Sequence, residues 1–396
     1  MKTPQQRAKR SGQLEMWLLL AAVCWMLLLG PIYGYDEKRS NTNPEANMNI
    51  SQIISYWGYP YEKYDTVTKD GYILGTYRIP YGRRCPEKTV PKPIVYLQHG
   101  LIGSAIDWIC NPPNNSLAFL LADNCYDVWL GNSRGNTWSR KHMNLSPKSS
   151  EFWAFSLDEM AKYDLPATID LIIEKTGQEQ LCYVGHSQGA TIGIFGADVI
   201  RMSALPYLWK GSIVSVENCF LWALFGDKIF SPYTPFDHFI ATKVCSKKIF
   251  HPVCSKFLFT LAGFDTRNLN MSRLDVYLSQ KPAGTSVQTM LHWAQILNSD
   301  QLQAFDWGNL DQNMMHFRQL TPPLYNITKM EVPTAIWSGG QDIVADAKDM
   351  KNLLPKVANL IYYKVIPHYN HMDFYLGQDV PQEIYQDLIR LMKEHL

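Results

Sequence analysis

Short, almost wholly apolar runs alternate with stretches of helical spacing in the first half of the chain. The apolar runs are typical of strands covered on both faces, and they occupy residues 93–98, 126–130 and 181–184. From Glu151 to Leu171 the apolar side chains recur with helical spacing, interrupted at Pro166. Upstream, apolar positions alternate from Tyr64 to Arg78 around Lys69-Asp70-Gly71, which indicates a hairpin. Strands alternating with helices predict an α/β fold with a mostly parallel central sheet.

The run Leu181–Val184 leads directly into Gly185-His186-Ser187-Gln188-Gly189, a G-x-S-x-G pattern followed by small and apolar residues. At such a pattern a strained strand-to-helix turn exposes the serine hydroxyl. The turn is too tight for a Cβ on either side of the serine, hence the two glycines. The bare pattern is weak support, and the buried strand before it strengthens the interpretation. Ser187 is therefore the candidate nucleophile.

An earlier strand supplies a second part of the same site. The run 93–98 ends in His99-Gly100-Leu101, well ahead of the serine. In a serine hydrolase such a segment brings a backbone N–H to the oxyanion hole, and the other donor is the N–H after the nucleophile, that of Gln188. Two fixed donors stabilise charge that develops only in the transition state. The alternative for His99-Gly100 is an ordinary turn at a strand end.

Candidates for the acid and the base follow two later strands. Residues 332–337 lead through two glycines to Asp342, a position suited to orienting an imidazole. Asp346 and Asp349 are rivals, but each lies deeper in an expected helix. The last strand, residues 360–366, is followed by His368 and His371, and from position alone either could be the base. The chain order Ser, Asp, His is that of a nucleophile-elbow hydrolase.

Three longer segments resemble the acid lipase family, which includes gastric and lysosomal acid lipases: residues 132–136 (NSRGN), 158–164 (DEMAKYD) and 185–189 (GHSQG). The similarity extends over residues 47–190 and again from 225 to the C-terminus. It implies an α/β-hydrolase fold with an inserted helical cap and hydrolysis of lipid carboxylic esters without a metal or other cofactor. The family's N-H-x-D-F pattern assigns the base to His371, and the oxyanion donors fall on Leu101 and Gln188.

The N-terminus predicts secretion. Lys2 to Arg10 form a basic head, residues 16–29 are apolar, and small residues follow, so residues 1–34 are interpreted as a signal peptide, with Met16 as an alternative start. An uncleaved anchor is the competing interpretation. Secretion fits the glycosylation acceptors Asn49, Asn114, Asn270 and Asn326, whereas Pro147 follows directly after the sequon of Asn144. A lysosomal destination is the alternative location.

The remaining expectations concern the cap and the partners. The predicted domains are a first core part (35–200), a cap (201–326) and a second core part (327–396). Within the cap, residues 234–264 are rich in apolar side chains, and the resemblance suggests a lid that opens onto a lipid surface. Cysteines 245 and 254 enclose a short segment and are the expected disulfide, while Cys182 is an expected buried thiol. A net charge of +1 argues against a nucleic-acid partner, leaving a lipid ester at an interface.

One segment departs from the family pattern. Only 35 residues separate Gly189 from Phe225, whereas family members have a longer segment that holds a further core strand. Residues 211–216 could supply a substitute strand. Two readings therefore stand: an active secreted lipase that hydrolyses neutral lipids, or a catalytically impaired or misfolded relative that lacks part of the core. A lysosomal steryl ester hydrolase is a further alternative.

Overall fold

The computed structural model describes residues 42–85, 91–196, 203–205, 226–263, 267–299 and 301–395. The chain divides into two units, Met1–Asn41 and Thr42–Leu396, and the first lies outside the described residues. The predicted signal peptide therefore lies outside them as well. No helix of the described ranges combines the length and the hydropathy needed to cross a membrane.

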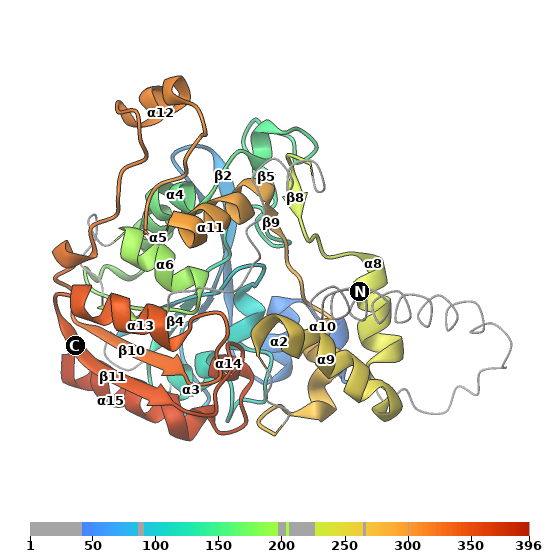
Figure 1. The fold of residues 1–396 in the computed structure, drawn as a ribbon. Coiled ribbons are helices and arrows are strands. Elements are labelled where there is room, and N and C mark those ends of the chain that lie inside the picture. Colours follow the sequence, from blue (N-terminus) through green and yellow to red (C-terminus); the bar gives the residue numbers. More distant parts are fainter. Residues whose placement is uncertain are drawn as a thin grey trace, which may run out of the picture. The chain divides into compact units, whose positions relative to one another are not determined.

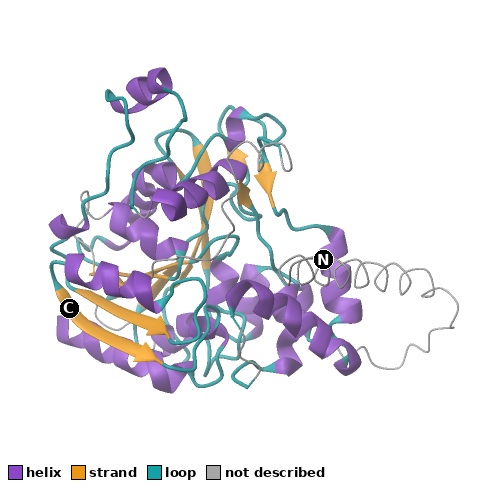
Figure 2. Cartoon of the chain, in the orientation of Figure 1, coloured by secondary structure: helices purple, strands orange, loops and turns teal. Residues whose placement is uncertain are grey.

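A mixed sheet runs through the second unit, with helices on both sides of it (Figures 1 and 2). Its strands are β1 (Glu62–Val67), β2 (Tyr72–Ile79), β3 (Ile94–Gln98), β4 (Asp127–Leu130), β5 (Lys141–His142), β6 (Cys182–Gly185) and β7 (Ser203–Leu205). Their order is β1-β2-β4-β3-β6-β7, with β5 beside β2. β4, β3, β6 and β7 are parallel to one another, and β1, β2 and β5 form the antiparallel hairpin region. The predicted α/β fold with mostly parallel central strands is confirmed.

The helices are α2 (Ile50–Tyr56), α3 (Leu117–Asp123), α4 (Leu157–Glu159), α5 (Leu165–Thr176), α6 (Gln188–Gly196), α8 (Pro235–Phe239), α9 (His251–Ala262), α10 (Leu274–Leu278), α11 (Val287–Ser299), α12 (Leu310–Phe317), α13 (Ala347–Leu353), α14 (Asp373–Leu376) and α15 (Gln386–His395). A π-helical turn, Met160–Asp164, joins α4 to α5, so the helix predicted from Glu151 begins at Leu157. Its N-terminus is set by a capping box between Ser156 and Glu159. Pro166 lies in the first turn of α5, where its missing N–H costs little.

The two faces of the sheet form separate hydrophobic clusters because successive side chains of a strand point to opposite faces. Val95 and Leu97 of β3 pack in one cluster with α3 and α15. Ile94 and Tyr96 pack in the other with α5, α6 and α13. Burial on both faces explains why these strands are nearly continuous apolar runs. Because the side chains of the strands themselves are buried in these clusters, the polar residues of the site come from the segments that follow the strands, at their carboxyl ends.

After α6 the described strands are either short or belong to separate two-stranded sheets. β7 has three residues and pairs with β6, while β10 (Thr334–Gly339) and β11 (Leu360–Ile366) form a separate parallel pair among the described strands. A further two-stranded sheet joins β8 (Ile229–Phe230) to β9 (Thr285–Ser286). The substitute strand considered for residues 211–216 lies outside the described residues. Among the described residues, the strand that follows α6 is the short β7.

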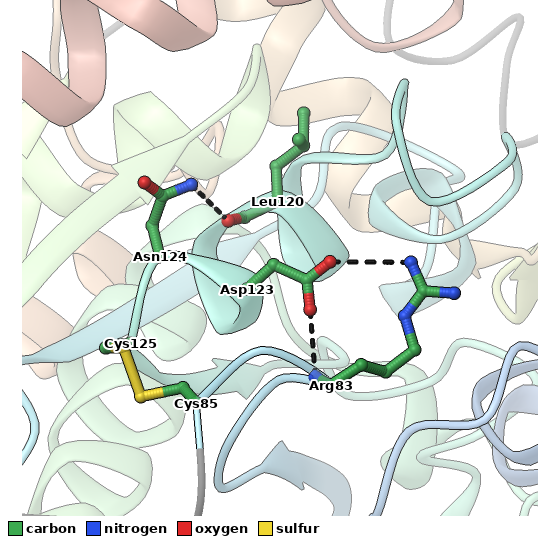
Figure 3. Close-up of a disulfide and its surroundings, with 6 residues drawn as sticks. All are labelled: Arg83, Cys85, Leu120, Asp123, Asn124 and Cys125. Atoms are coloured by element: carbon green, nitrogen blue, oxygen red, sulfur yellow. Dashed lines mark hydrogen bonds and ion pairs between the residues drawn. A yellow bond between two sulfur atoms is a disulfide. The ribbon is translucent and has the colours of Figure 1, made fainter.

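Two disulfides form among the described cysteines. The expected pair is present, with Cys245 joined to Cys254 at the start of α9. The second, between Cys85 and Cys125, has no signal in the spacing because its cysteines lie 40 positions apart. Figure 3 shows it beside Asp123, whose carboxylate accepts hydrogen bonds from the backbone and side chain of Arg83. Cys182 is a buried thiol in β6, as expected, and Cys219 lies outside the described residues.

Candidate active site

Ser187 occupies the turn between β6 and α6. Its backbone has φ of +54°, in the left-handed region that a side chain rarely adopts. A Cβ on Gly189 would lie 2.4 Å from the carbonyl oxygen of Gln98, and one on Gly185 would lie 2.5 Å from the backbone nitrogen of Ala190. The flanking glycines are thus required by close backbone contacts. This is the geometry that the G-x-S-x-G pattern predicts.

His371 and Asp342 meet Ser187 in a continuous hydrogen-bonded chain. The Nε2 atom of His371 lies 2.9 Å from the Ser187 Oγ, and its Nδ1 atom lies 2.9 Å from a carboxylate oxygen of Asp342. The serine comes from the β6–α6 turn, the aspartate from the loop after β10 and the histidine from the loop after β11. The structure therefore brings together the three residues that the sequence suggested. A serine, an imidazole and a carboxylate in this order can perform nucleophilic acyl transfer.

Backbone hydrogen bonds fix the carboxylate. The second oxygen of Asp342 accepts the N–H groups of Val344 and Ala345, each at 2.8 Å. The rival Asp346 instead caps α13 by accepting the N–H groups of Lys348 and Asp349. Asp342 is therefore held toward the histidine, while Asp346 has a local structural role.

The loop that carries His371 is fixed by its neighbours. The side chain of Asn370 accepts the N–H groups of Met372 and Asp373, and Asp373 in turn accepts the N–H of Asn370 at 2.6 Å. His368 lies elsewhere: it is exposed, and its Nε2 atom lies 2.8 Å from the carboxylate of Asp379. The N-H-x-D pattern thus describes a local turn that presents His371 to the serine.

His186 is a neighbour of the site that the sequence did not single out. Its ring lies 4.9 Å from that of His371 and 5.0 Å from that of Tyr375, measured between centroids. Burial lowers the pKa of His186 well below its usual value, and the adjacent His371 lowers it further. The neutral ring donates its Nε2–H to the backbone carbonyl of His371 at 2.9 Å. His186 therefore supports the backbone of His371, and because it stays neutral it does not compete with His371 for the proton of Ser187.

The turn Gly100–Gly103 lies against the serine. A Cβ on Gly100 would be 3.1 Å from the Ser187 Cβ, and the N–H of Gly103 closes the turn on the Gly100 carbonyl at 3.1 Å. Ile102 within the turn has φ of +51°, an unfavourable value for a β-branched residue. Leu101 is thus located in a strained turn beside the nucleophile, and Gln188 is the first residue of α6. Both expected oxyanion donors belong to segments that contact Ser187.

His99 connects this turn to the N-S-R-G-N segment. The N–H of Ser133 donates to His99 Nε2 at 3.0 Å, so the Nδ1–H of the ring donates to the Gly100 carbonyl at 2.7 Å. Burial lowers the pKa of His99, which keeps this tautomer neutral. The side chain of Asn132 accepts the N–H of Ala105, just after the turn. The N-S-R-G-N segment therefore supports the turn, a role that could not be read from its sequence alone.

Arg134 holds the N-S-R-G-N segment in place through two carboxylate partners. Its guanidinium is 1% exposed and forms ion pairs with Asp164 at 2.7 Å and Asp70 at 2.6 Å. Asp164 also accepts the backbone N–H of Arg134 at 3.0 Å. A fully buried arginine is stable only when its donors are paired in this manner. The D-E-M-A-K-Y-D segment thus contributes its last aspartate to the support of the site.

The nucleophile is buried in this structure, with Ser187 3% exposed. The residue after it is anchored from the predicted cap: the Nε1–H of Trp293, on α11, donates to the side chain of Gln188 at 3.0 Å. The asparagines predicted to be glycosylation acceptors lie at the surface. Asn49, Asn114 and Asn326 are exposed, and Asn270 is partly exposed.

Family models match most of the chain. A model described as "alpha/beta hydrolase fold" matches residues 93–197 and 234–378, and a "Partial alpha/beta-hydrolase lipase region" matches residues 50–112. Solved structures agree on the fold: a "putative lipase" from Sulfolobus solfataricus has a TM-score of 0.56 at 12% identity, covering 85% of this chain and 99% of that one. A monoglyceride lipase variant from Saccharomyces cerevisiae has a TM-score of 0.51 at 14% identity, covering 92% and 98%.

Curated relatives are much more similar in sequence. Human lipase member K is 71% identical over 398 residues, covering 96% of this chain and 100% of the relative. Human gastric triacylglycerol lipase is 53% identical over 400 residues, covering 96% and 99%. A lysosomal acid lipase/cholesteryl ester hydrolase of Macaca fascicularis is 48% identical over 403 residues, covering 96% and 100%.

Proposed function

Because this chain belongs to the acid lipase family of α/β-hydrolases, a family of carboxylic ester hydrolases, we propose that it hydrolyses esters of neutral lipids through Ser187, His371 and Asp342. The observation that carries the proposal is the hydrogen-bonded chain from Ser187 Oγ through the His371 imidazole to Asp342, with 2.9 Å at each contact. Each group has the partner that its role requires. The serine faces a base, and the base faces a carboxylate.

The reaction has two stages. His371 takes the proton of Ser187 as its oxygen attacks the ester carbonyl, and Asp342 stabilises the imidazolium and fixes its orientation. The imidazolium then gives its proton to the leaving alkoxide, which departs as an alcohol and leaves an acyl-enzyme. Water attacks the acyl group by the same route, with His371 again the base. The products are a carboxylic acid and an alcohol, and no cofactor takes part.

The backbone N–H groups of Leu101 and Gln188 supply the oxyanion hole in this proposal. The contact between Gly100 and Ser187 supports it, as does the position of Gln188 at the start of α6. Donors fixed in advance stabilise the tetrahedral oxygen without reorganisation during the reaction. Removal of one such donor typically lowers kcat by about 10²–10³-fold.

Residues 234–264 act as a lid in the proposed function. Ser187 is buried, so an ester reaches it only after a covering segment moves. The candidate segment exposes large apolar side chains, namely Phe236, Phe239, Ile249 and Val253. Exposed apolar side chains of this kind are suited to contact with a lipid surface. Together with the predicted signal peptide and the surface acceptor asparagines, this favours a secreted glycoprotein acting at a lipid interface.

A second candidate is an impaired relative that retains the site but lacks full activity. The observation that favours it is the short β7, beyond which the described strands continue only as the separate β10–β11 pair. A lysosomal steryl ester hydrolase differs from the first candidate in substrate and location rather than in mechanism.

The test is labelling with a fluorophosphonate followed by assays on emulsions of a triacylglycerol and of a cholesteryl ester. We expect labelling at Ser187 and release of fatty acid, with both lost in Ser187→Ala while the melting temperature stays unchanged. The loss of turnover is expected to be about 10⁴-fold or more for a triad nucleophile. Labelling without turnover on either emulsion would favour the impaired relative, and undiminished turnover in Ser187→Ala would exclude the assignment of the nucleophile.

A further inference from the structure

A buried ion pair outside the triad lies beside the turn that carries Leu101. The Nζ atom of Lys281 is 3.1 Å from a carboxylate oxygen of Asp107, and the two side chains are 16% and 5% exposed. The same ammonium donates to the hydroxyl of Tyr375 at 2.5 Å and lies 4.2 Å from the centroid of that ring. Burying a charge is costly even when it is paired.

The ion pair is coupled to the strained turn from two directions. Two residues after Lys281, the N–H of Ala283 donates to the carbonyl of Ile102 at 2.8 Å. From the other side, a Cβ on Gly103 would lie 2.4 Å from the second carboxylate oxygen of Asp107, so this carboxylate packs directly against the turn. Ile102, at φ of +51°, keeps its unfavourable conformation only if its surroundings enforce it.

The second partner of the ammonium connects it to the loop that carries the base. Tyr375 belongs to α14, which follows His371 in the chain, and its ring packs edge-on against His186. His186 in turn donates to the backbone carbonyl of His371. The ammonium thus contacts the segment after the turn, through Asp107, and the helix behind the base, through Tyr375. No other part of the proposed mechanism uses this ammonium.

We propose that Lys281 is a positioning residue, which with Asp107 and Tyr375 holds the Leu101 N–H at the distance from Ser187 that the oxyanion requires. The inference rests on the proposed function, since it assigns a role within the same ester hydrolysis. Loss of the ammonium releases the carboxylate and the Ala283 segment, and the strained turn then relaxes away from the serine. A shift of about 1 Å in a catalytic group lowers a rate by about 10²-fold.

The decisive variant is Lys281→Met, which keeps the length of the stem and removes the charge and the donors. We expect kcat on a soluble ester to fall about 10²-fold while KM changes little, because the lost interaction acts in the transition state. Fluorophosphonate labelling should slow by a similar factor, since the tetrahedral phosphorus adduct places an oxygen in the same hole. Lys281→Arg retains the charge and is expected to recover part of both rates.

A matched control is the pair of Arg78 and Asp127, whose side chains are 18% and 5% exposed and 2.6 Å apart. Asp127 is at the start of β4, the end opposite to the site. Arg78→Met should lower the melting temperature and leave kcat unchanged. If Lys281→Met also lowers only the melting temperature, the ion pair is merely structural and the proposal is wrong.

Tyr375→Phe keeps the proposal testable if Lys281→Met does not fold. It removes one hydroxyl and leaves the ion pair and the aromatic packing in place. We expect a fall in kcat of roughly threefold to tenfold without a change in melting temperature, a small fraction of the loss caused by a misplaced donor. An unchanged kcat would overturn the proposal. Full activity in Ser187→Ala would instead overturn the proposed function, so the two failures are distinguishable.

Discussion

Asp342 and His371 share one hydrogen bond of 2.9 Å, and it decides which nitrogen of the imidazole faces the nucleophile. Because the carboxylate accepts the Nδ1–H, the other nitrogen is left as an acceptor, and it lies 2.9 Å from the Ser187 hydroxyl. His368 has its own carboxylate partner, Asp379, and is exposed. The two histidines of the last loop therefore have different environments.

This difference predicts different losses of activity. His371→Ala should lower kcat by about 10⁴-fold or more, as expected for the base of a triad. His368→Ala breaks only an exposed pair, which contributes about 1 kcal/mol or less to stability, and should leave kcat within a few-fold of the native value. Kinetics of both variants on one soluble ester, with melting temperatures as the control, provide the comparison. The opposite ranking would transfer the role of base to His368.

The Cys245–Cys254 disulfide predicts a loss specific to interfaces. It closes a short loop within the proposed lid, and on the loop-entropy model it contributes about 2.5–3 kcal/mol. Replacing both cysteines by serine should therefore lower activity on emulsions more than on soluble esters. The matched control is the Cys85–Cys125 pair, which lies next to Arg83 and Asp123. Removal of this control disulfide should lower stability without changing the ratio of activity on emulsions to activity on soluble esters. An equal ratio in both double variants would contradict the proposed role of the Cys245–Cys254 disulfide in the lid.

The buried histidine behind the base predicts a dependence of stability on pH. Burial lowers the pKa of His186 in the folded state, whereas in the unfolded chain it returns to about 6.5. As the pH falls below that value the unfolded state binds a proton that the folded state does not, so the free energy of unfolding decreases. The slope is about 1.4 kcal/mol per pH unit for each such group.

The measurement is urea unfolding of the native chain and of His186→Gln between about pH 7 and pH 5, the range in which the unfolded histidine titrates. The variant lacks the titrating ring, so its stability should fall less steeply with decreasing pH. His99, whose pKa is also lowered by burial, retains its own contribution in both proteins and serves as an internal reference. Parallel curves would show that His186 does not contribute.

The short strand after α6 predicts that a longer segment at this place would raise the stability and the activity of this chain. Each backbone group left buried without a partner costs about 1–3 kcal/mol, against a typical net stability of roughly 5–15 kcal/mol. Grafting a family-length segment between Gly189 and Phe225 should therefore raise both the melting temperature and kcat. If α6 is misplaced in the native chain, the N–H of Gln188 at its start is misplaced as well. Correcting its position in the graft would add to the expected gain in kcat. A native chain that already melts cooperatively and hydrolyses emulsions at the rate of the graft would show that β7 suffices.

Much of the fold and of the site could be predicted because their signals are local. The apolar runs and G-x-S-x-G are contiguous in sequence, and they gave the parallel strands and Ser187. The choice between His368 and His371 needed the N-H-x-D-F resemblance, because both follow the same strand. The Cys85–Cys125 bond and the contacts of Lys281 depend on how distant segments pack, and no pattern within either segment encodes them.

The separation of Ser187 from His371 also has a consequence for biosynthesis. The two residues are 184 positions apart, and a ribosome that adds about 5–20 residues per second needs about 10–40 s to cover that distance. Throughout this interval the elbow serine exists without its general base. A nascent chain can therefore fold its first strands, but by the proposed mechanism it cannot cleave an ester until translation has passed the last strand.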